Sequence, residues 1–286
     1  MKSNRIISFI IILFTYIFAS ILGVFVYKQN ISNNIYINIL YADIVATLFV
    51  YAIGIVFNNA SVYDPYWSVA PMVILPLILF EHSSFNLGNV LLLTVVFYWS
   101  VRLTINWAYT FKSLSHQDWR YTMIKDRTKK FFPIVSLFGI NLMPTLIVYI
   151  AILPAIYYII NLEFHLLNII GFILCVVAVT IQLISDYQMH KFRKNNLYKS
   201  KSINSGLWKY SRHPNYFGEI LMWWSVWFIC FSSDISSWYL IVGALLNTIL
   251  FLIVSIPMQE KRLLNSKDNY KDYINTTSML VPWFKK

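Results

Sequence analysis

The chain has 286 residues, of which 58% are hydrophobic, 18% aromatic and 12% charged, and its formal net charge is +11. Soluble domains carry about 25% charged residues, so this composition excludes a soluble globular protein. The apolar residues fall in runs of about 18 or more, the length of a helix that crosses a bilayer. The sequence therefore predicts an all-α, multi-pass membrane protein, in the inner membrane if the source is bacterial.

Eight candidate membrane spans follow one another along the chain, at residues 6–27, 35–57, 66–80, 88–111, 134–160, 166–186, 215–231 and 238–257. The third is short and holds Pro71 and Pro76, which predicts a kinked or re-entrant segment. We therefore expect a helical bundle with seven to eight transmembrane helices.

Basic residues are concentrated in three segments: 112–133 holds six Lys or Arg, 187–214 holds seven, and the tail from residue 258 holds six. Eight spans place these segments and the N-terminus on one side, which the positive-inside rule makes cytoplasmic. We therefore expect cytoplasmic N- and C-termini. Basic loops also attract anionic membrane lipids, whereas nucleic acid is not an expected partner, because no basic domain lies outside the membrane.

The common motifs of metal and nucleotide sites are missing. Cys175 and Cys230 both lie in predicted spans, so neither a disulfide framework nor a zinc site is expected, and no metal ligand is predicted. None of the eight glycines are two residues apart, which excludes the GxGxxG dinucleotide fingerprint. A nucleotide would need a different architecture.

A polar stripe follows the sixth predicted span, in the segment IQLISDYQMHKFR. Gln182, Asp186 and Arg193 share one face of a helix that leaves the membrane. Such a stripe can be a solvated helix end. Gln182, however, extends it into the apolar span, where polar side chains are costly and indicate function.

A second polar group surrounds the start of the next span, in GLWKYSRHPNYFGEILMWW. Pro214 is suited to begin a helix, with Arg212 and His213 just before it and Asn215 and Glu219 one turn apart inside it. The helix N-terminus and Arg212 favour an anion. Asn215 and Glu219 are suited to recognise a hydrogen-bonding group such as a carboxamide; the alternative is a helix cap with a helix-start charge.

A third polar group, Glu260, Lys261 and Arg262, directly follows the last span. Lys261 and Arg262 either mark the membrane boundary or bind phosphate. The hydrophobic residues within 263–273 predict one amphipathic helix that lies against the membrane face.

Asp64 precedes Pro65 at the entrance to the third span, among aromatic residues. Aromatic walls disfavour the ionised carboxylate, and a neutral acid can donate a hydrogen bond to a substrate oxygen. The alternative is an ordinary helix-entry Asp. Arg102 lies deep in the fourth span and needs a partner or a polar cavity, and Asp64 is one candidate partner.

With these residues in view, residues 60–284 resemble the steroid 5α-reductase family, especially its bacterial relatives of unassigned substrate. The most specific pieces are SDYQMHKFR, GLWKYSRHPNYFGE and the Pro-Trp-Phe ending. The resemblance implies that NADPH binds among the helices without a Rossmann domain. It implies cofactor contacts from Asp186, Arg193, Asn215 and Glu219, with Gln182 near a family Asn. The neighbouring residues of the three polar groups complete the predicted cofactor-binding set: Arg212, His213, Glu260, Lys261 and Arg262.

The resemblance also implies a catalytic set. The family acid is a Glu seven residues before a Pro, and here Asp64 stands seven before Pro71. A family Tyr three residues before an Arg becomes Trp99 before Arg102, with Tyr98 adjacent. The predicted catalytic residues are therefore Asp64, Tyr98, Trp99 and Arg102, and the Trp argues against strict steroid specificity.

The RHPNYFGE core is also similar to the isoprenylcysteine carboxyl methyltransferases, which use S-adenosylmethionine. Three hypotheses follow: an NADPH-dependent reductase of a conjugated double bond in a lipid or steroid-like enone, a methyltransferase of a lipid or lipid-linked acid, and a non-enzymatic lipid-binding protein. Asp64 favours the reductase, because hydride addition at the β-carbon is helped by an acid at the carbonyl. We expect membrane helices over 1–59 and the catalytic region over 60–286, within one membrane-embedded unit.

Overall fold

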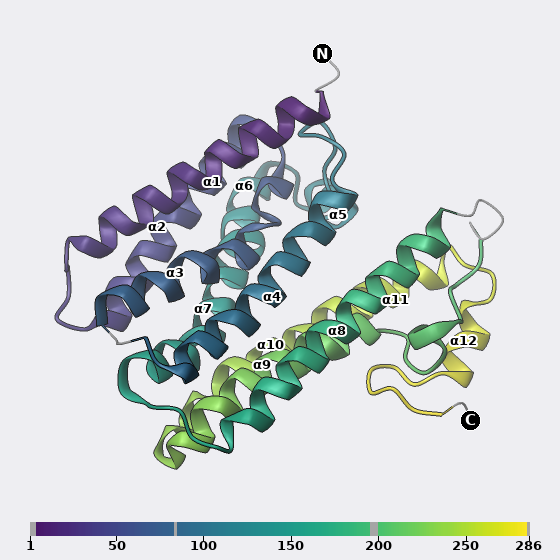
Figure 1. Ribbon diagram of the computed structural model, residues 1–286. Helices are drawn as coiled ribbons and strands as arrows, with labels where there is room; N and C mark the ends of the chain where they lie inside the picture. Colours follow the sequence, from purple (N-terminus) through teal and green to yellow (C-terminus); the bar gives the residue numbers. More distant parts are fainter. Residues whose placement is uncertain (1–3, 83–84, 195–199, 285–286) are drawn as a thin grey trace. The chain divides into compact units, whose positions relative to one another are not determined.

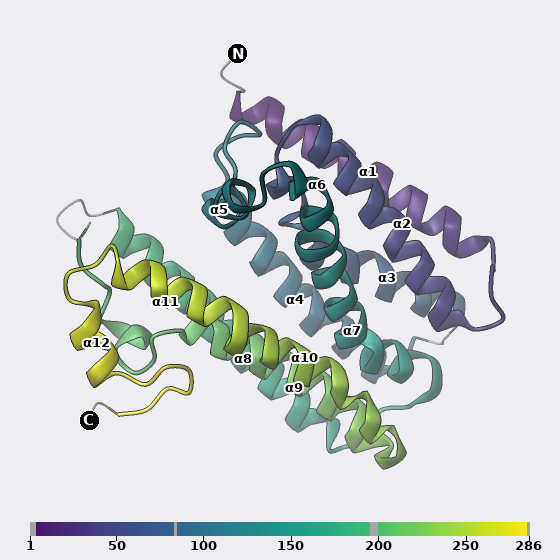
Figure 2. The same ribbon diagram turned by 180° about the vertical axis from the view of Figure 1, so that it is seen from behind.

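The computed structural model describes residues 4–82, 85–194 and 200–284 (Figures 1 and 2). Within these ranges the chain forms helices and no strand, with one isolated bridge between Ser211 and Ser278. The predicted all-α class is confirmed.

Seven helical segments of the described chain are long and apolar enough to cross a membrane: Arg5–Lys28, Ile35–Val56, Ala60–His82, Leu87–Thr110, Trp119–Asn161, Asn168–Arg193 and Ile235–Leu264. The chain is therefore a multi-pass integral membrane protein. The predicted span at 215–231 is helical but is not one of the seven, because Glu219 and several Trp and Ser residues make it less apolar. The side on which the termini lie stays a prediction.

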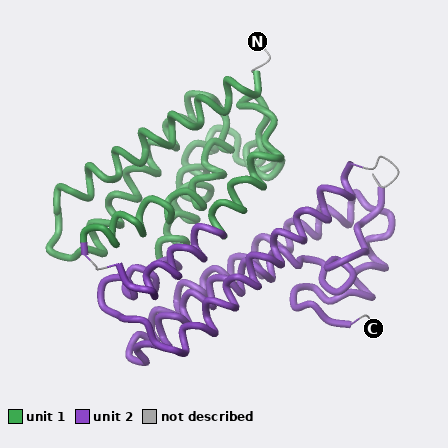
Figure 3. The backbone as a smooth tube through the Cα atoms, in the orientation of Figure 1, with its two compact units in different colours: residues 1–81, 99–150 green, residues 82–98, 151–286 purple. Residues whose placement is uncertain are grey.

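Two compact units divide the chain (Figure 3). Unit 1 comprises residues 1–81 and 99–150, and unit 2 comprises residues 82–98 and 151–286. The division does not follow residue 59, since the first three long helices pack with later segments in unit 1. A catalytic region that begins at residue 60 stays a prediction.

Unit 1 consists of α1 (Arg5–Lys28), α2 (Ile35–Val56), η1 (Ala60–Tyr63), α3 (Tyr66–His82), the second half of α4 (Leu87–Thr110), α5 (Trp119–Thr128), η2 (Lys129–Phe131), α6 (Phe132–Val135), η3 (Ser136–Leu142) and the first part of α7 (Met143–Asn161). Side-chain caps begin several of these helices. Asn4 begins α1, Asn34 begins α2 and Asp118 begins α5, each by accepting a backbone N–H two residues on. The short connection before Asn34 turns α2 back alongside α1 (Figure 1).

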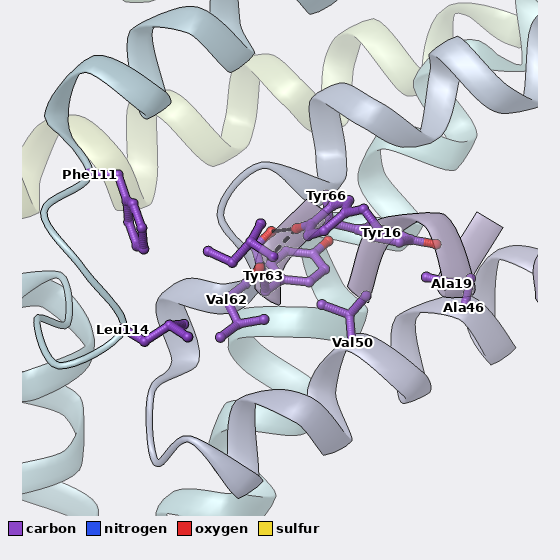
Figure 4. Packing of buried hydrophobic residues seen from close by; sticks show 10 residues of the cluster. Tyr16, Ala19, Ala46, Val50, Val62, Tyr63, Tyr66, Phe111 and Leu114 are labelled. Atoms are coloured by element: carbon purple, nitrogen blue, oxygen red, sulfur yellow. Dashed lines mark hydrogen bonds between the residues drawn. The ribbon is translucent and has the colours of Figure 1, made fainter. Parts of the chain in front are cut away.

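Aromatic side chains form much of the unit 1 core (Figure 4). The rings of Tyr63 and Tyr66 stack with their centroids 5.4 Å apart. The Tyr16 hydroxyl donates to the carbonyl of Val62 at 2.9 Å. Buried tyrosines need such partners, and this bond connects α1 to the η1 turn that holds the next residues of interest.

Unit 2 consists of the first half of α4, the end of α7, α8 (Asn168–Arg193), η5 (Gly206–Lys209), α9 (Pro214–Ser233), η6 (Ile235–Ile241), α10 (Val242–Ile249), η7 (Leu250–Ser255), α11 (Ile256–Leu264) and α12 (Tyr270–Thr276). Both ribbon views show α8 and α9 side by side along most of their lengths. As predicted, α9 begins at Pro214.

Two glycines allow α8 and α9 to pack closely. A Cβ atom at Gly218 would lie 2.6 Å from the carbonyl oxygen of Ala178 and 2.6 Å from Cγ of Gln182. A Cβ atom at Gly171 would lie 2.5 Å from a side-chain carbon of Ile229. Larger side chains at either position would push the helices apart.

The tail differs from the single amphipathic helix predicted over 263–273. It forms two helices, α11 and α12, separated by residues 265–269. Tyr270 and Tyr273 are buried, and the Tyr273 hydroxyl donates to the carbonyl of Trp208. The prediction was wrong because these tyrosines pack inside the unit.

Candidate functional site

Gln182 is the most unusual of the predicted residues. Its side chain is fully buried on α8, and neither its amide nitrogen nor its amide oxygen makes a hydrogen bond within the described chain. An unsatisfied buried donor or acceptor costs about 1–3 kcal/mol, so such a group needs an explanation. A polar ligand that pairs with the amide would remove the cost.

The polar stripe continues from Gln182 along α8. Because α8 is one continuous helix, Asp186 and Arg193 lie on the same face as Gln182. Asp186 is half-buried, and Arg193 is the last residue of α8. The prediction of a shared face is confirmed.

A cluster of cations gathers beyond the end of α8. We call Arg193, Arg262 and Lys267 the basic cluster. Burial lowers the pKa of the Lys267 ammonium, and the positive charges of Arg193 and Arg262 lower it further against the opposite effect of Asp268. The positive charges of these three side chains, from α8, α11 and the following turn, therefore act on one another, and the carboxylates of Asp186 and Asp268 act on Arg193 and Lys267 with the opposite sign. Lys261 and Arg262 are both exposed on α11.

Arg212, His213 and Glu260 form a hydrogen-bonded group at the start of α9, in which Arg212 and His213 are buried and Glu260 is half-buried. Arg212 Nε donates to Glu260 Oε1 at 2.8 Å, and His213 Nε2 lies 3.1 Å from the same oxygen. Arg212 Nη1 also donates to the carbonyl of Thr277 at 2.6 Å. These contacts hold the loop before α9 against α11 and the tail. All three residues therefore stabilise the packing of this loop.

The carboxylate of Glu219 is buried within α9, where Oε1 accepts from Trp223 Nε1 at 3.0 Å. Asn215 lies one turn earlier and is half-buried. The neighbouring Gly218 is the residue against which Gln182 packs. The amide of Gln182 on α8 and the carboxylate of Glu219 on α9 therefore both lie near the point where the two helices cross closely.

Asp64 belongs to unit 1 and has a partner that the sequence did not suggest. The Tyr121 hydroxyl donates to Asp64 Oδ1 at 2.6 Å. Tyr121 lies on α5, which begins at the cap residue Asp118, and Asp118 accepts from Arg120 Nε at 2.8 Å. Pairing of Asp64 with Arg102 stays a prediction.

The other predicted catalytic residues lie on α4, which contributes to both units. Trp99 and Arg102 are buried in unit 1. Tyr98 belongs to unit 2, where its hydroxyl lies 3.3 Å from Thr180 Oγ1 of α8. Of the four predicted catalytic residues, Asp64, Trp99 and Arg102 therefore belong to unit 1 and Tyr98 belongs to unit 2.

Asp43 is a buried acid that the sequence analysis missed. It lines an apolar pocket between α1, α2 and α3 with a cavity volume of about 50 Å³, and its Oδ1 accepts from the Tyr66 hydroxyl at 2.7 Å. The available signal was a lone acidic residue in the middle of the second predicted span, which is functional by default. Tyr121 and Lys267 were missed as well, and only the fold brings them to their partners.

The long apolar helices define a multi-pass membrane protein, and each of its two units contains buried polar groups. Residues 50–277 match the model of the family described as "Protein of unknown function (DUF1295)". The chain therefore belongs to this family, which includes steroid 5α-reductase-like membrane proteins. No curated protein and no solved structure matched the chain.

Proposed function

We propose that the protein is an NADPH-dependent reductase that reduces a conjugated carbon–carbon double bond in a lipid or steroid-like enone. The observation that carries the proposal is the stripe on α8, with an unpaired buried amide at Gln182 and the basic cluster at the far end. About 16 Å separates Gln182 from Arg193 along the helix, at 1.5 Å per residue. An elongated cofactor with a carboxamide at one end and phosphates at the other matches this order of groups.

The residues of unit 2 suit the polar parts of NADPH. Gln182 can both donate to and accept from a carboxamide, and Asn215 and Glu219 lie on α9, the helix that crosses α8 closely at Gly218. Arg193, Arg262 and Lys267 would hold phosphate oxygens through charge-assisted hydrogen bonds. Arg212, His213 and Glu260 would keep the α9 start in place.

NADPH, when bound, supplies a hydride. An acid of this chain would donate a hydrogen bond to the carbonyl oxygen of the enone, which favours hydride addition at the β-carbon, and a proton completes the reduction at the α-carbon. Asp64 is the predicted acid. Asp43 is the alternative that the structure adds, because it is a buried acid on the wall of an apolar pocket among membrane-spanning helices.

The basic cluster favours this proposal over methyl transfer. S-adenosylmethionine carries a positive sulfonium and no phosphate, so the basic cluster would gain little from binding it. The buried acids also have no required role in a non-enzymatic lipid-binding protein, where each would cost stability.

Ligand binding to the purified full-length protein in detergent tests the proposal. We expect calorimetry to detect NADPH binding and no binding of S-adenosylmethionine. Lys267→Ala should weaken NADPH binding about tenfold or more, the loss of one charge-assisted contact of about 1.5–3 kcal/mol. Lys271→Ala is the matched control, because Lys271 is exposed on α12. Binding of S-adenosylmethionine in place of NADPH would overturn the proposal.

Turnover distinguishes the two acids. NADPH oxidation with an enone lipid should fall about 100-fold or more when the polarising acid is lost, while NADPH affinity stays the same. Asp64→Leu and Asp43→Leu are compared, with Tyr121→Phe and Tyr66→Phe as variants that remove only each partner hydroxyl. Full turnover in both aspartate variants would contradict an acid-assisted reduction.

A further inference from the structure

A second pocket of unit 1 lies where α2 ends and α5 passes into α6. Its cavity volume is about 300 Å³, and it belongs entirely to unit 1. One wall is apolar, with Val50, Ile55, Phe132 and Pro133. Ile35–Val56 is one of the membrane-spanning candidates, so the pocket opens at the end of a span, where lipid headgroups meet acyl chains.

Three lysines line this pocket: Lys125, Lys129 and Lys130. No acidic side chain of the described chain is among the lining residues. Lys125 Nζ donates to the neutral Asn58 Oδ1 at 2.8 Å and lies 5.7 Å from the centre of the Phe132 ring. The lining therefore carries a net positive charge.

The backbone around the pocket is held in uncommon conformations. Asn58 and Lys129 both line the pocket and have φ angles of 50° and 48°, a region that residues other than glycine rarely adopt. Ser136 and Asn141 come from the π-helix η3, whose geometry is frequent at functional sites. Such strain persists where the surrounding structure requires it, and it clusters at ligand sites.

We propose that this pocket binds the phosphate headgroup of an anionic membrane lipid, with the acyl chain along the apolar wall. The lysine ammonium groups would pair with the phosphate oxygens. The apolar wall at the end of a span selects a lipid over a free anion. None of the residues assigned to NADPH or to the enone carbonyl is among the lining residues of this pocket.

Native mass spectrometry of the full-length protein in detergent tests the proposal, with dihexanoyl phosphatidate, dihexanoyl phosphatidylcholine and inorganic phosphate as probes. We expect phosphatidate to bind more tightly than either of the others. Lys129→Gly should weaken phosphatidate binding about tenfold, because it removes one charge. Glycine accepts a positive φ, so the lipid-free variant should melt at the same or a higher temperature.

Lys112→Gly is the control, because Lys112 is an exposed lysine of unit 1 outside the pocket lining. It should leave phosphatidate binding unchanged. Equal binding of phosphatidylcholine would overturn the role of charge, and equal binding of inorganic phosphate would overturn the assignment to a lipid. Unchanged phosphatidate affinity in Lys129→Gly would exclude this pocket.

Discussion

Two buried amides of α8 have opposite surroundings. Asn168, at the start of the helix, accepts from the Tyr158 hydroxyl at 3.0 Å and donates to the Ile229 carbonyl at 2.8 Å and to Ser232 Oγ at 2.9 Å. Gln182 has no such bonds within the described chain. The first amide joins helices, whereas the second remains available to a ligand.

This contrast predicts opposite effects on stability. Gln182→Leu should raise the free energy of unfolding by about 1–3 kcal/mol, because it removes an unsatisfied buried amide. It should also weaken NADPH binding about 2- to 10-fold, the value of one neutral hydrogen bond. Asn168→Leu should lower the unfolding free energy by about 1–3 kcal/mol, because its partners lose their bonds. Thermal melting with and without NADPH measures both; destabilisation by Gln182→Leu would show that this amide is structural.

The lowered pKa of Lys267 predicts an alkaline effect on cofactor binding. As the pH rises through this lowered pKa, Lys267 loses its charge, so phosphate affinity should fall at a lower pH than for an ordinary lysine. Rising pH has the opposite effect on the folding stability of the protein without cofactor. The unfolded chain binds the proton more tightly, so stability should rise between the lowered and the ordinary pKa.

Lys267→Arg tests this effect, because arginine keeps its charge throughout the alkaline range. NADPH affinity measured between pH 7 and about 10 should fall in the wild type and stay nearly constant in the variant. The same alkaline fall in Lys267→Arg would assign the titration to another group.

Residues that are close in sequence were easier to predict than residues that meet through the fold. The α8 stripe follows from helical spacing alone. The bond between Asp64 and Tyr121 joins residues from different elements, and the apolar sequence around Asp43 contains no indication of its pocket. The cofactor-binding and catalytic assignments themselves stay predictions.

At the scale of elements, the close crossing of α8 and α9 depends on Gly218. Gly218→Ala should lower the free energy of unfolding by about 1–3 kcal/mol, since the added methyl group meets backbone at Ala178 and the side chain of Gln182. NADPH affinity should fall as well, because both flanking groups move. Gly139→Ala is the control, since nothing lies within 4 Å of its added Cβ. Equal melting temperatures for the two variants would show that the crossing tolerates expansion.

Helix starts were predictable where a residue has a chemical reason to begin a helix. Pro214 has a fixed φ and needs no N–H partner, and α9 begins there. The π-helices η3 and η7 have no such signal, and the break between α11 and α12 was missed because buried tyrosines resemble a membrane-facing row.

At the scale of the whole molecule, composition predicted the class because a bilayer requires long apolar helices. It could not predict how these helices group into units. Unit 1 joins residues 1–81 to 99–150, and α4 contributes to both units. Grouping depends on side-chain packing between distant segments, which hydropathy does not record.

The contacts between the α9 entry and the tail also determine when the protein can finish folding. Arg212 N donates to the carbonyl of Ser278 at 2.8 Å, and Trp283 N donates to the carbonyl of Tyr210 at 3.0 Å. These partner residues are synthesised about 70 residues after the loop before α9, and chains fold from the N-terminus during synthesis. The loop therefore lacks its backbone partners while α9, α10, α11 and α12 are being made, and a chain that stalls in this interval carries the loop without them.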